Sequence, residues 1–337
     1  MEKFAFLTAA FGAMFITAAS GLVIVPALRK LHFGQTIKEI GPTWHAGKNG
    51  TPTMGGLTFY LGVLLGVVGG YMVLAVSVPQ VLGNYFSQQS VSLFIAVLTS
   101  FAFGLVGFVD DYIKVVKKRN LGLRARAKIV AQILITGAFL TSLHLNGTLT
   151  TLVALPLFGV VDFGYFFYPI SFLLIIGMVN AVNLTDGIDG LAASVTFVSM
   201  LGFLFISSML GQTSIAVFSA AVAGGCGGFL AWNFYPAKTF MGDTGSMFLG
   251  GAVVSAAYCM GRPELLLFLG FIYLIEAFSV MLQVGYFKLT HGKRIFKMSP
   301  IHHHFEMCGW SEIKIVAVFS LVCLIGVALG CLFVYLY

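Results

Sequence analysis

The chain has 337 residues, of which 58% are hydrophobic and only 9% are charged, and its mean hydropathy is +0.97. Soluble domains average about 25% charged residues, so this composition excludes a soluble protein and indicates a polytopic membrane protein. The net charge of +7 would suggest a nucleic-acid partner in a soluble protein. Here the charges follow membrane topology, and we expect no nucleic acid to bind.

Apolar stretches long enough to cross a bilayer recur along the whole chain. At roughly 20 residues per membrane helix, we expect an all-α protein of about ten spans in one integral membrane domain, residues 1–337, without a cleavable signal peptide. The predicted spans are 4–28, 54–76, 92–112, 128–145, 168–185, 190–210, 214–235, 247–261, 265–287 and 313–335. After the fourth, Thr148 to Phe163 alternates in polarity around Gly159 and could form a small outer β-hairpin.

The basic residues divide unequally between the two sides of this arrangement. Of the 19 Lys and Arg residues, 17 fall in alternate loops, and only Lys3 and Arg262 lie on the opposite side. Cytoplasmic loops carry such an excess of Lys and Arg. We therefore expect these loops in the cytoplasm and both termini outside.

One polar stretch, Asn180–Gly190, interrupts the apolar sequence between the fifth and sixth spans. It contains Asp186 and Asp189, and an ionised carboxylate in hydrocarbon costs about 2.5–3.5 kcal/mol even on insertion scales. A polar loop between two spans is the simplest interpretation of one such residue. Five polar groups within about ten residues favour a functional site instead.

Other polar groups fall on the same predicted cytoplasmic face, and each has an ordinary structural alternative. Asp110 and Asp111 could anchor a span end, and Asp243 in the run Gly242–Ser246 could cap a helix. The remaining groups are Lys48 and Thr53 in the Gly-rich run Lys48–Gly56, Lys114 with Lys117, Lys118 and Arg119, Asn233, and His302, His303 and His304. The lysines and hydroxyls would suit a sugar phosphate, and the histidines would bind phosphate or brace a loop.

Within the ninth span, Glu276 and Gln283 lie seven residues apart and therefore share a helix face. An intramembrane carboxylate is functional by default, although a buried, hydrogen-bonded structural role is nearly as common. The histidine triplet lacks the partner ligands of a zinc site. The five cysteines (Cys226, Cys259, Cys308, Cys323, Cys331) also show no metal spacing and are expected to be small hydrophobes.

Taken together, these groups indicate phosphoryl transfer. Carboxylate-rich sets without cysteine suit Mg²⁺, which is often shared with substrate phosphates. Phosphoryl transfer requires a metal that offsets developing charge, cations that hold a diphosphate, and a positioned nucleophile. We expect these components at one membrane surface.

Four segments resemble motifs of the polyprenyl-phosphate N-acetylhexosamine-1-phosphate transferases. They are Phe108–Tyr112, Asn180–Gly190, Phe240–Asp243 and Pro300–Glu306, and Thr51–Gly56 accompanies them. The resemblance covers about residues 45–306. It implies an enzyme of the bacterial inner membrane that uses Mg²⁺ to move phospho-N-acetylmuramoyl-pentapeptide from its UDP-linked donor to undecaprenyl phosphate, giving lipid I and UMP. A homodimer is also a family-level expectation.

The resemblance also implies a role for each matching residue. It makes Asp243 the Mg²⁺ ligand, Asp110 or Asp111 the nucleophile or base, and His302 and His303 required for activity. The expected nucleotide side consists of Lys48, Asn183, Asp186, Asp189, Asn233, Phe240 and Gln283, with Lys48 and Phe240 near the uracil. Thr53, Lys114 and His304 complete the predicted substrate-binding set.

Alternatives remain at this point. The lipid phosphate attacks directly or an aspartate first forms a phospho-enzyme; we favour direct attack, because a lipid phosphate is already largely ionised. Transfer of N-acetylglucosamine-1-phosphate is the nearest other reaction. A proton-coupled transporter would use Asp186, Asp189 and Glu276 as a relay, but the polar groups crowd one face and no internal repeat is visible.

Overall fold

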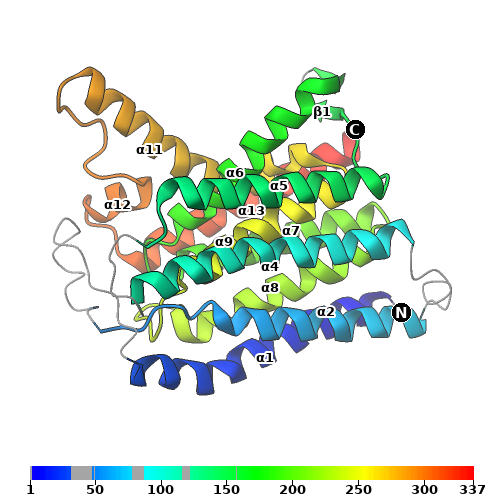
Figure 1. Cartoon of the computed structure of the whole chain (residues 1–337), viewed down its shortest axis with the longest axis horizontal. Coiled ribbons are helices and arrows are strands. Elements are labelled where there is room, and N and C mark those ends of the chain that lie inside the picture. The colour runs from blue at the N-terminus through cyan, green and yellow to red at the C-terminus, as the bar shows by residue number, and fades with distance from the viewer. Residues whose placement is uncertain (1, 32–47, 49, 78–86, 116–121, 157) are drawn as a thin grey trace.

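Long helices running side by side form almost the whole protein (Figure 1). The computed structural model describes residues 2–31, 48, 50–77, 87–115, 122–156 and 158–337. The long helices are α1 (Glu2–Lys30), α2 (Leu57–Ser77), α4 (Gln88–Val115), α5 (Ala125–Leu145), α6 (Phe167–Thr185), α7 (Leu191–Met209), α8 (Thr213–Asn233), α9 (Gly242–Cys259), α11 (Phe271–Leu289) and α13 (Glu312–Leu336). Within the described ranges, nine helices are long and apolar enough to cross a membrane. The predicted all-α polytopic class is confirmed.

The tenth long helix, α9, differs from the other nine. It corresponds to the predicted span 247–261, but it is 18 residues long and begins with the polar run Gly242–Ser246. Every residue from Thr244 to Cys259 is buried, and the helix lies in the middle of the bundle (Figure 1). The protein therefore surrounds α9 with other helices, so that its polar first turn faces protein groups.

The predicted span 265–287 is interrupted at Gly270, so its prediction as one continuous helix is wrong. A 3-10 turn (Pro263–Leu265) and the short helix α10 (Leu266–Leu269) precede α11. A Cβ atom on Gly270 would lie 2.6 Å from the Leu266 carbonyl oxygen and 2.8 Å from Cε of Met178. The backbone changes direction where only glycine fits, and α11 leans away from the bundle (Figure 1).

The predicted β-hairpin is present. Strands β1 (Leu152–Leu155) and β2 (Gly159–Asp162) pair antiparallel, with Leu152 opposite Asp162. The 3-10 turn Gly164–Phe166 then leads into α6.

Small residues allow the first helices to pack closely. A Cβ atom on Gly224 or Gly228 of α8 would overlap the carbonyl oxygen of Ala10 or Met14 of α1, respectively. Helices in membranes associate through such close backbone approach, because lipid supplies no hydrophobic force between them. The α1–α8 contact is therefore one of backbone against backbone.

The termini and the histidine helix α12 (Ile301–Glu306) lie at opposite ends of the bundle. The start of α1 and the end of α13 are both at the right of Figure 1, and α12 is at the left. This arrangement agrees with the predicted placement of both termini on one side. Four of the 17 basic residues predicted in cytoplasmic loops lie outside the described residues: Lys38, Lys117, Lys118 and Arg119.

Candidate active site

Three carboxylates meet at the end of the bundle that carries α12. One oxygen atom from each of Asp110, Asp111 and Asp243 lies within 4.8 Å of the others. Asp110 and Asp111 are adjacent in α4, which continues to Val115, and each is 3% exposed. Adjacent side chains on a helix point in different directions, so the carboxylates of Asp110 and Asp111 have different hydrogen-bond partners.

Two lysines neutralise part of this charge. Nζ of Lys114 lies 2.5 Å from Oδ2 of Asp110 and 2.9 Å from Oδ2 of Asp243. Nζ of Lys128, in the first turn of α5, lies 3.1 Å from the same Asp243 oxygen. The predicted phosphate-binding Lys114 is thus part of the cluster.

The two adjacent aspartates have separate structural tasks. Oδ2 of Asp111 accepts hydrogen bonds from the backbone N–H of Thr244 at 2.8 Å and from its hydroxyl at 2.7 Å. Asp111 therefore caps α9 from another helix, a role more often played by the preceding residue. Oδ1 of Asp110 accepts the backbone N–H of Leu123 at 2.7 Å, which ties the segment before α5 to the cluster.

The polar stretch 180–190 forms the end of α6 and the turn into α7. The side-chain amide of Asn183 donates to Oδ1 of Asp243 and to Oγ of Ser246, both at 2.8 Å. Asp186 and Asp189 lie beyond the last helical residue, Thr185. The structure therefore brings this stretch beside the cluster, as predicted.

Asp186 lies in an environment that disfavours its charge. Removal from water, followed by the negative charges of Asp243 and Asp111, raises the pKa of Asp186 to about 8. A carboxylic acid with such a pKa keeps its proton near neutral pH. Perturbation of this kind is common at functional sites.

Lys48 and Asp189 form a second polar group, which we call the lysine bracket, with Glu312 of α13. Nζ of Lys48 lies 2.7 Å from Oδ1 of Asp189 and 2.7 Å from Oε2 of Glu312. That Glu312 oxygen also accepts the N–H of Asp189 at 2.9 Å, and Oδ2 of Asp189 accepts the N–H of Ala237 at 2.9 Å. The bracket joins segments distant in the sequence.

The segments around Thr53, Asn233 and Phe240 support the site from one side. Oδ1 of Asn233 accepts the N–H of Gly190 at 3.1 Å, and its amide donates to the carbonyl of Thr239 at 3.0 Å. Phe240 donates its N–H to the Pro52 carbonyl at 2.8 Å. Thr53 is 6% exposed, and a Cβ on Gly242 would lie 2.8 Å from its hydroxyl oxygen. Thr53 and Phe240 therefore both lie beside the start of α9.

The three histidines and Gln283 have different partners. Nδ1 of His302 lies 3.0 Å from Oε2 of Glu276, and Nδ1 of His303 lies 2.5 Å from Oε2 of Glu306. Nδ1 of His304 accepts the N–H of Lys297 at 3.1 Å. Gln283 accepts the N–H groups of Ile295 and Phe296 and donates to the Phe296 carbonyl at 3.1 Å. His304 and Gln283 thus brace the loop before α12.

Sequence reasoning missed three residues that contact these groups: Thr244, Glu312 and, as a member of the cluster, Lys128. Lys128 was predicted only as one of many topology charges. In the sequence, Ser311 followed by Glu312 resembles an ordinary helix start. The structure agrees, because the Ser311 side chain accepts the N–H of Lys314. No spacing in the chain indicates that Glu312 reaches Lys48.

The cluster of three aspartates could bind a divalent metal ion. It offers oxygen donors only, which hard cations such as Mg²⁺ prefer. The two ammonium groups beside Asp110 and Asp243 show that these oxygens already accommodate cations. The side chains of Asp110, Asp111 and Asp243 are therefore suitable ligands for Mg²⁺.

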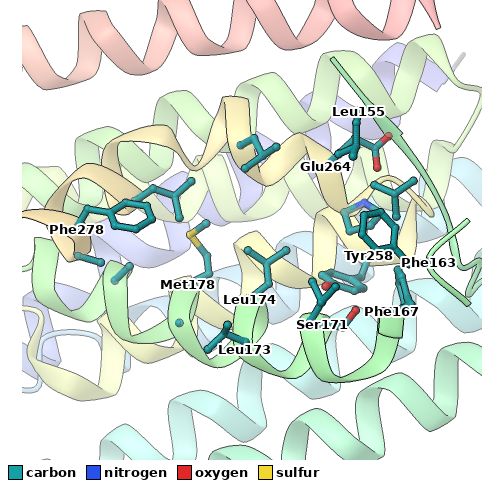
Figure 2. Close-up of a pocket in the computed structure, with 18 of the residues that line it drawn as sticks. Leu155, Phe163, Phe167, Ser171, Leu173, Leu174, Met178, Tyr258, Glu264 and Phe278 are labelled. Atoms are coloured by element: carbon teal, nitrogen blue, oxygen red, sulfur yellow. The ribbon is translucent and has the colours of Figure 1, made fainter. Parts of the chain in front are cut away.

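A cavity of about 440 Å³ lies between α6 and α11, next to β1 and the turn before α10 (Figure 2). Its lining is almost wholly apolar and includes Leu174, Met178 and Phe278, with the polar groups of Ser171 and Glu264 toward one end. None of the three clustered aspartates lines it. The cavity is thus a hydrophobic space separate from the charged cluster.

Comparisons with known proteins agree with this arrangement. The sequence profile of glycosyl transferase family 4 matches residues 93–261, and phospho-N-acetylmuramoyl-pentapeptide-transferase signature 1 matches residues 48–59. The phospho-N-acetylmuramoyl-pentapeptide-transferase of Heliobacterium modesticaldum is 48% identical over 326 residues, 95% of this chain and 96% of the relative. Those of Caldanaerobacter subterraneus and Acetivibrio thermocellus are 46% and 44% identical, over 92% and 91% of this chain and 93% and 89% of their own lengths. The chain therefore belongs to the phospho-N-acetylmuramoyl-pentapeptide-transferases of glycosyl transferase family 4.

Proposed function

We propose that this protein transfers phospho-N-acetylmuramoyl-pentapeptide from its UDP-linked donor to undecaprenyl phosphate, giving lipid I and UMP, at the cytoplasmic face of the bacterial plasma membrane. The observation that carries the chemistry is the meeting of Asp110, Asp111 and Asp243 within 4.8 Å, beside two lysines. Carboxylates for a metal and ammonium groups for phosphates are the components of phosphoryl transfer. The basic loops support the cytoplasmic orientation.

The charged cluster is the proposed reaction centre. Asp243, beside Asp110 and Asp111, would be the principal ligand of Mg²⁺, which supplies a Lewis acid that offsets the charge of the diphosphate. Asn183 orients Asp243 through its 2.8 Å hydrogen bond. Lys114 and Lys128 hold the phosphates, and Thr244 fixes the carboxylate of Asp111.

The remaining predicted residues surround the nucleotide. Lys48 and Asp189, joined at 2.7 Å, with Phe240 beside the uracil, form the nucleoside side. Asn233 holds the turn at Gly190 that carries this wall. The mouth of the site would be completed by Thr53, Asp186, Gln283, His303 and His304.

The lipid acceptor approaches from the bilayer. Its phosphate lies at headgroup level, and part of its isoprenoid chain would lie in an apolar space such as the cavity between α6 and α11. A phosphate oxygen of the lipid attacks the β-phosphorus of the donor. A new oxygen–phosphorus bond forms, the bond to the bridging oxygen breaks, and UMP leaves. We assign Asp110 the orienting role, because it shares Lys114 with Asp243.

The test is UMP release by the purified protein with undecaprenyl phosphate and Mg²⁺. We expect release from UDP-N-acetylmuramoyl-pentapeptide and none from UDP-N-acetylglucosamine. Loss of release in Asp243→Asn, with an unchanged unfolding temperature, would assign the activity to this site. If the folded wild-type protein releases no UMP from the first donor, the proposal is wrong.

A further inference from the structure

Glu276 and His302 form a buried pair that the proposed mechanism leaves unused. Glu276 lies in α11, fewer than two turns after the break at Gly270, and His302 lies in α12. Both side chains are 0% exposed, and Oε2 of Glu276 is 3.0 Å from Nδ1 of His302. A buried carboxylate without a partner is strongly destabilising, so this contact sets the geometry of both groups.

The pair determines which nitrogen of His302 carries a proton. A carboxylate accepts hydrogen bonds, so the neutral imidazole donates its Nδ1–H to Glu276 and keeps a lone pair on Nε2. Among the described residues, neither Nε2 of His302 nor Oε1 of Glu276 has a hydrogen-bond partner. The ring is thus held at one nitrogen and presents the other.

The free nitrogen faces the turn that carries Asp186. A Cβ atom on Gly187 would overlap Nε2 of His302 and would lie 2.8 Å from Cε1. Gly187 directly follows Asp186, whose charged neighbours include Asp243 and Asp111 of the cluster. The imidazole therefore packs against the backbone that positions Asp186 beside the cluster.

The other two histidines of α12 have different partners from His302. His303 pairs with Glu306 of its own helix, and His304 accepts the N–H of Lys297. His302 joins α11, through Glu276, to the turn between α6 and α7, through Gly187. Its placement depends on α11 and therefore on Glu276.

We propose that Glu276 is a positioning residue: it fixes the tautomer and orientation of His302, which packs on Gly187 and holds the Asp186 turn against the reaction centre. The inference rests on the proposed function for its kinetic part only. Mutating a carboxylate that orients a metal-ligating histidine typically lowers metal affinity or activity about 10–100-fold. We expect a loss of activity of similar size when Glu276 no longer orients His302.

The kinetic test compares Glu276→Gln with Glu276→Met. The Gln carbonyl still accepts the Nδ1–H, whereas Met fills a similar volume without an acceptor. We expect kcat to fall less than about tenfold in Glu276→Gln and about 100-fold in Glu276→Met, with KM for the UDP-linked donor within about twofold. Asp162→Asn is the control, because Asp162 is an exposed carboxylate of the hairpin that does not line the apolar cavity and lies outside the reaction centre. Equal kcat values for folded Glu276→Met and wild type would overturn the proposal.

A second measurement needs no substrate and no activity. The ¹⁵N spectrum of imidazole-labelled protein, with the His302 signal assigned by its loss in His302→Gln, reports the protonated nitrogen. We expect the Nδ1–H form in wild type and in Glu276→Gln; the Nε2–H form in wild type would overturn the inference. If wild type shows Nδ1–H yet releases no UMP, the proposed function fails and the positioning stands.

Gly187→Ala tests the contact without touching Glu276, should Glu276→Met fail to fold. The added methyl displaces His302, so we expect a fall in kcat that is not additive with that of Glu276→Gln. Gly285→Ala on α11 is the control, because among the described residues no heavy atom outside the adjoining helix backbone lies within 4 Å of a Cβ there. Full activity of folded Gly187→Ala would contradict the proposal.

Discussion

Asp111 of α4 caps helix α9 at Thr244, accepting its backbone N–H at 2.8 Å and its hydroxyl at 2.7 Å. A cap supplied by a distant helix couples the reaction centre to the packing of α4 on α9. A hydrogen bond to a charged group contributes about 1.5–3 kcal/mol. We expect Thr244→Val, which loses the hydroxyl at equal volume, to lower the unfolding temperature and the UMP-release rate. Thr244→Ser keeps the donor and should retain both; equal losses in the two variants would contradict this.

The metal dependence distinguishes Asp243 from Asp110. If Asp243 is the principal ligand, Asp243→Asn raises the half-saturating Mg²⁺ concentration by about tenfold or more, and added Mg²⁺ partly restores activity. Loss of the orienting group in Asp110→Asn is not relieved by Mg²⁺. The measurement is UMP release over a range of Mg²⁺ concentrations. Identical Mg²⁺ curves for the two variants would exclude this division of roles.

The raised pKa of Asp186, about 8, makes the free energy of unfolding fall as pH rises. The folded protein keeps this proton up to about pH 8, whereas the unfolded chain loses it near the ordinary value of about 3.9. The stability contribution is therefore complete below about pH 4 and is lost as pH rises toward about 8. Asp186→Asn has no such proton.

The unfolding temperature in detergent, measured with a chelator across this pH range, checks the sign. We expect the advantage of Asp186→Asn over wild type to grow with pH and to level above about pH 8. Asp162→Asn changes an exposed carboxylate of the hairpin and serves as the control. An advantage that is constant with pH would show that Asp186 titrates normally.

The lysine bracket makes a separate prediction. Glu312 holds Lys48 at 2.7 Å, on the proposed nucleoside side and away from the reacting phosphorus. Glu312→Gln should raise KM for the UDP-linked donor by about tenfold, since a charged hydrogen bond is lost, and should leave kcat within about threefold. Lys314→Ala, which changes a charge two residues away that lies over the Trp310 ring, should alter neither KM nor kcat. A fall in kcat alone for Glu312→Gln would move Glu312 to the reaction centre.

Direct attack by the lipid phosphate predicts no covalent enzyme intermediate. Protein mixed with donor labelled in the β-phosphate, without lipid acceptor, should retain no label after acid denaturation. Asp110 and Asp111 already accept hydrogen bonds from Leu123 and Thr244, which hold them in place. A trapped aspartyl phosphate would establish the two-step route instead.

Much of the architecture follows from the sequence because lipid imposes strong rules. Runs of about 20 apolar residues must be helices, and nine of the ten predicted spans each fall on one described helix, whereas the span 265–287 is divided between α10 and α11. The convergence of Asp110, Asp186 and Asp243 also followed, because alternating spans return each motif to the same end of the bundle. That prediction required only the number of membrane crossings between the motifs and no knowledge of side-chain contacts.

The contacts within the site could not be predicted in the same way. Glu312 and Lys48 are 264 residues apart, and their pairing depends on how α13 packs on α7. The break at Gly270 arises from the carbonyl of Leu266 and the side chain of Met178, and only the folded structure brings Met178 there. Single-residue contacts of this kind leave no periodic signal.

The backbone contact of α8 with α1 has a consequence for motion. Gly224 and Gly228 leave no layer of side chains that could shift when one helix slides along the other. Protein interiors of this density transmit force and do not deform gradually. We therefore expect any opening that admits a large donor and a lipid on the flank of α11, which leans outward beyond its glycine break (Figure 1), and we expect α1 and α8 to keep their relative position.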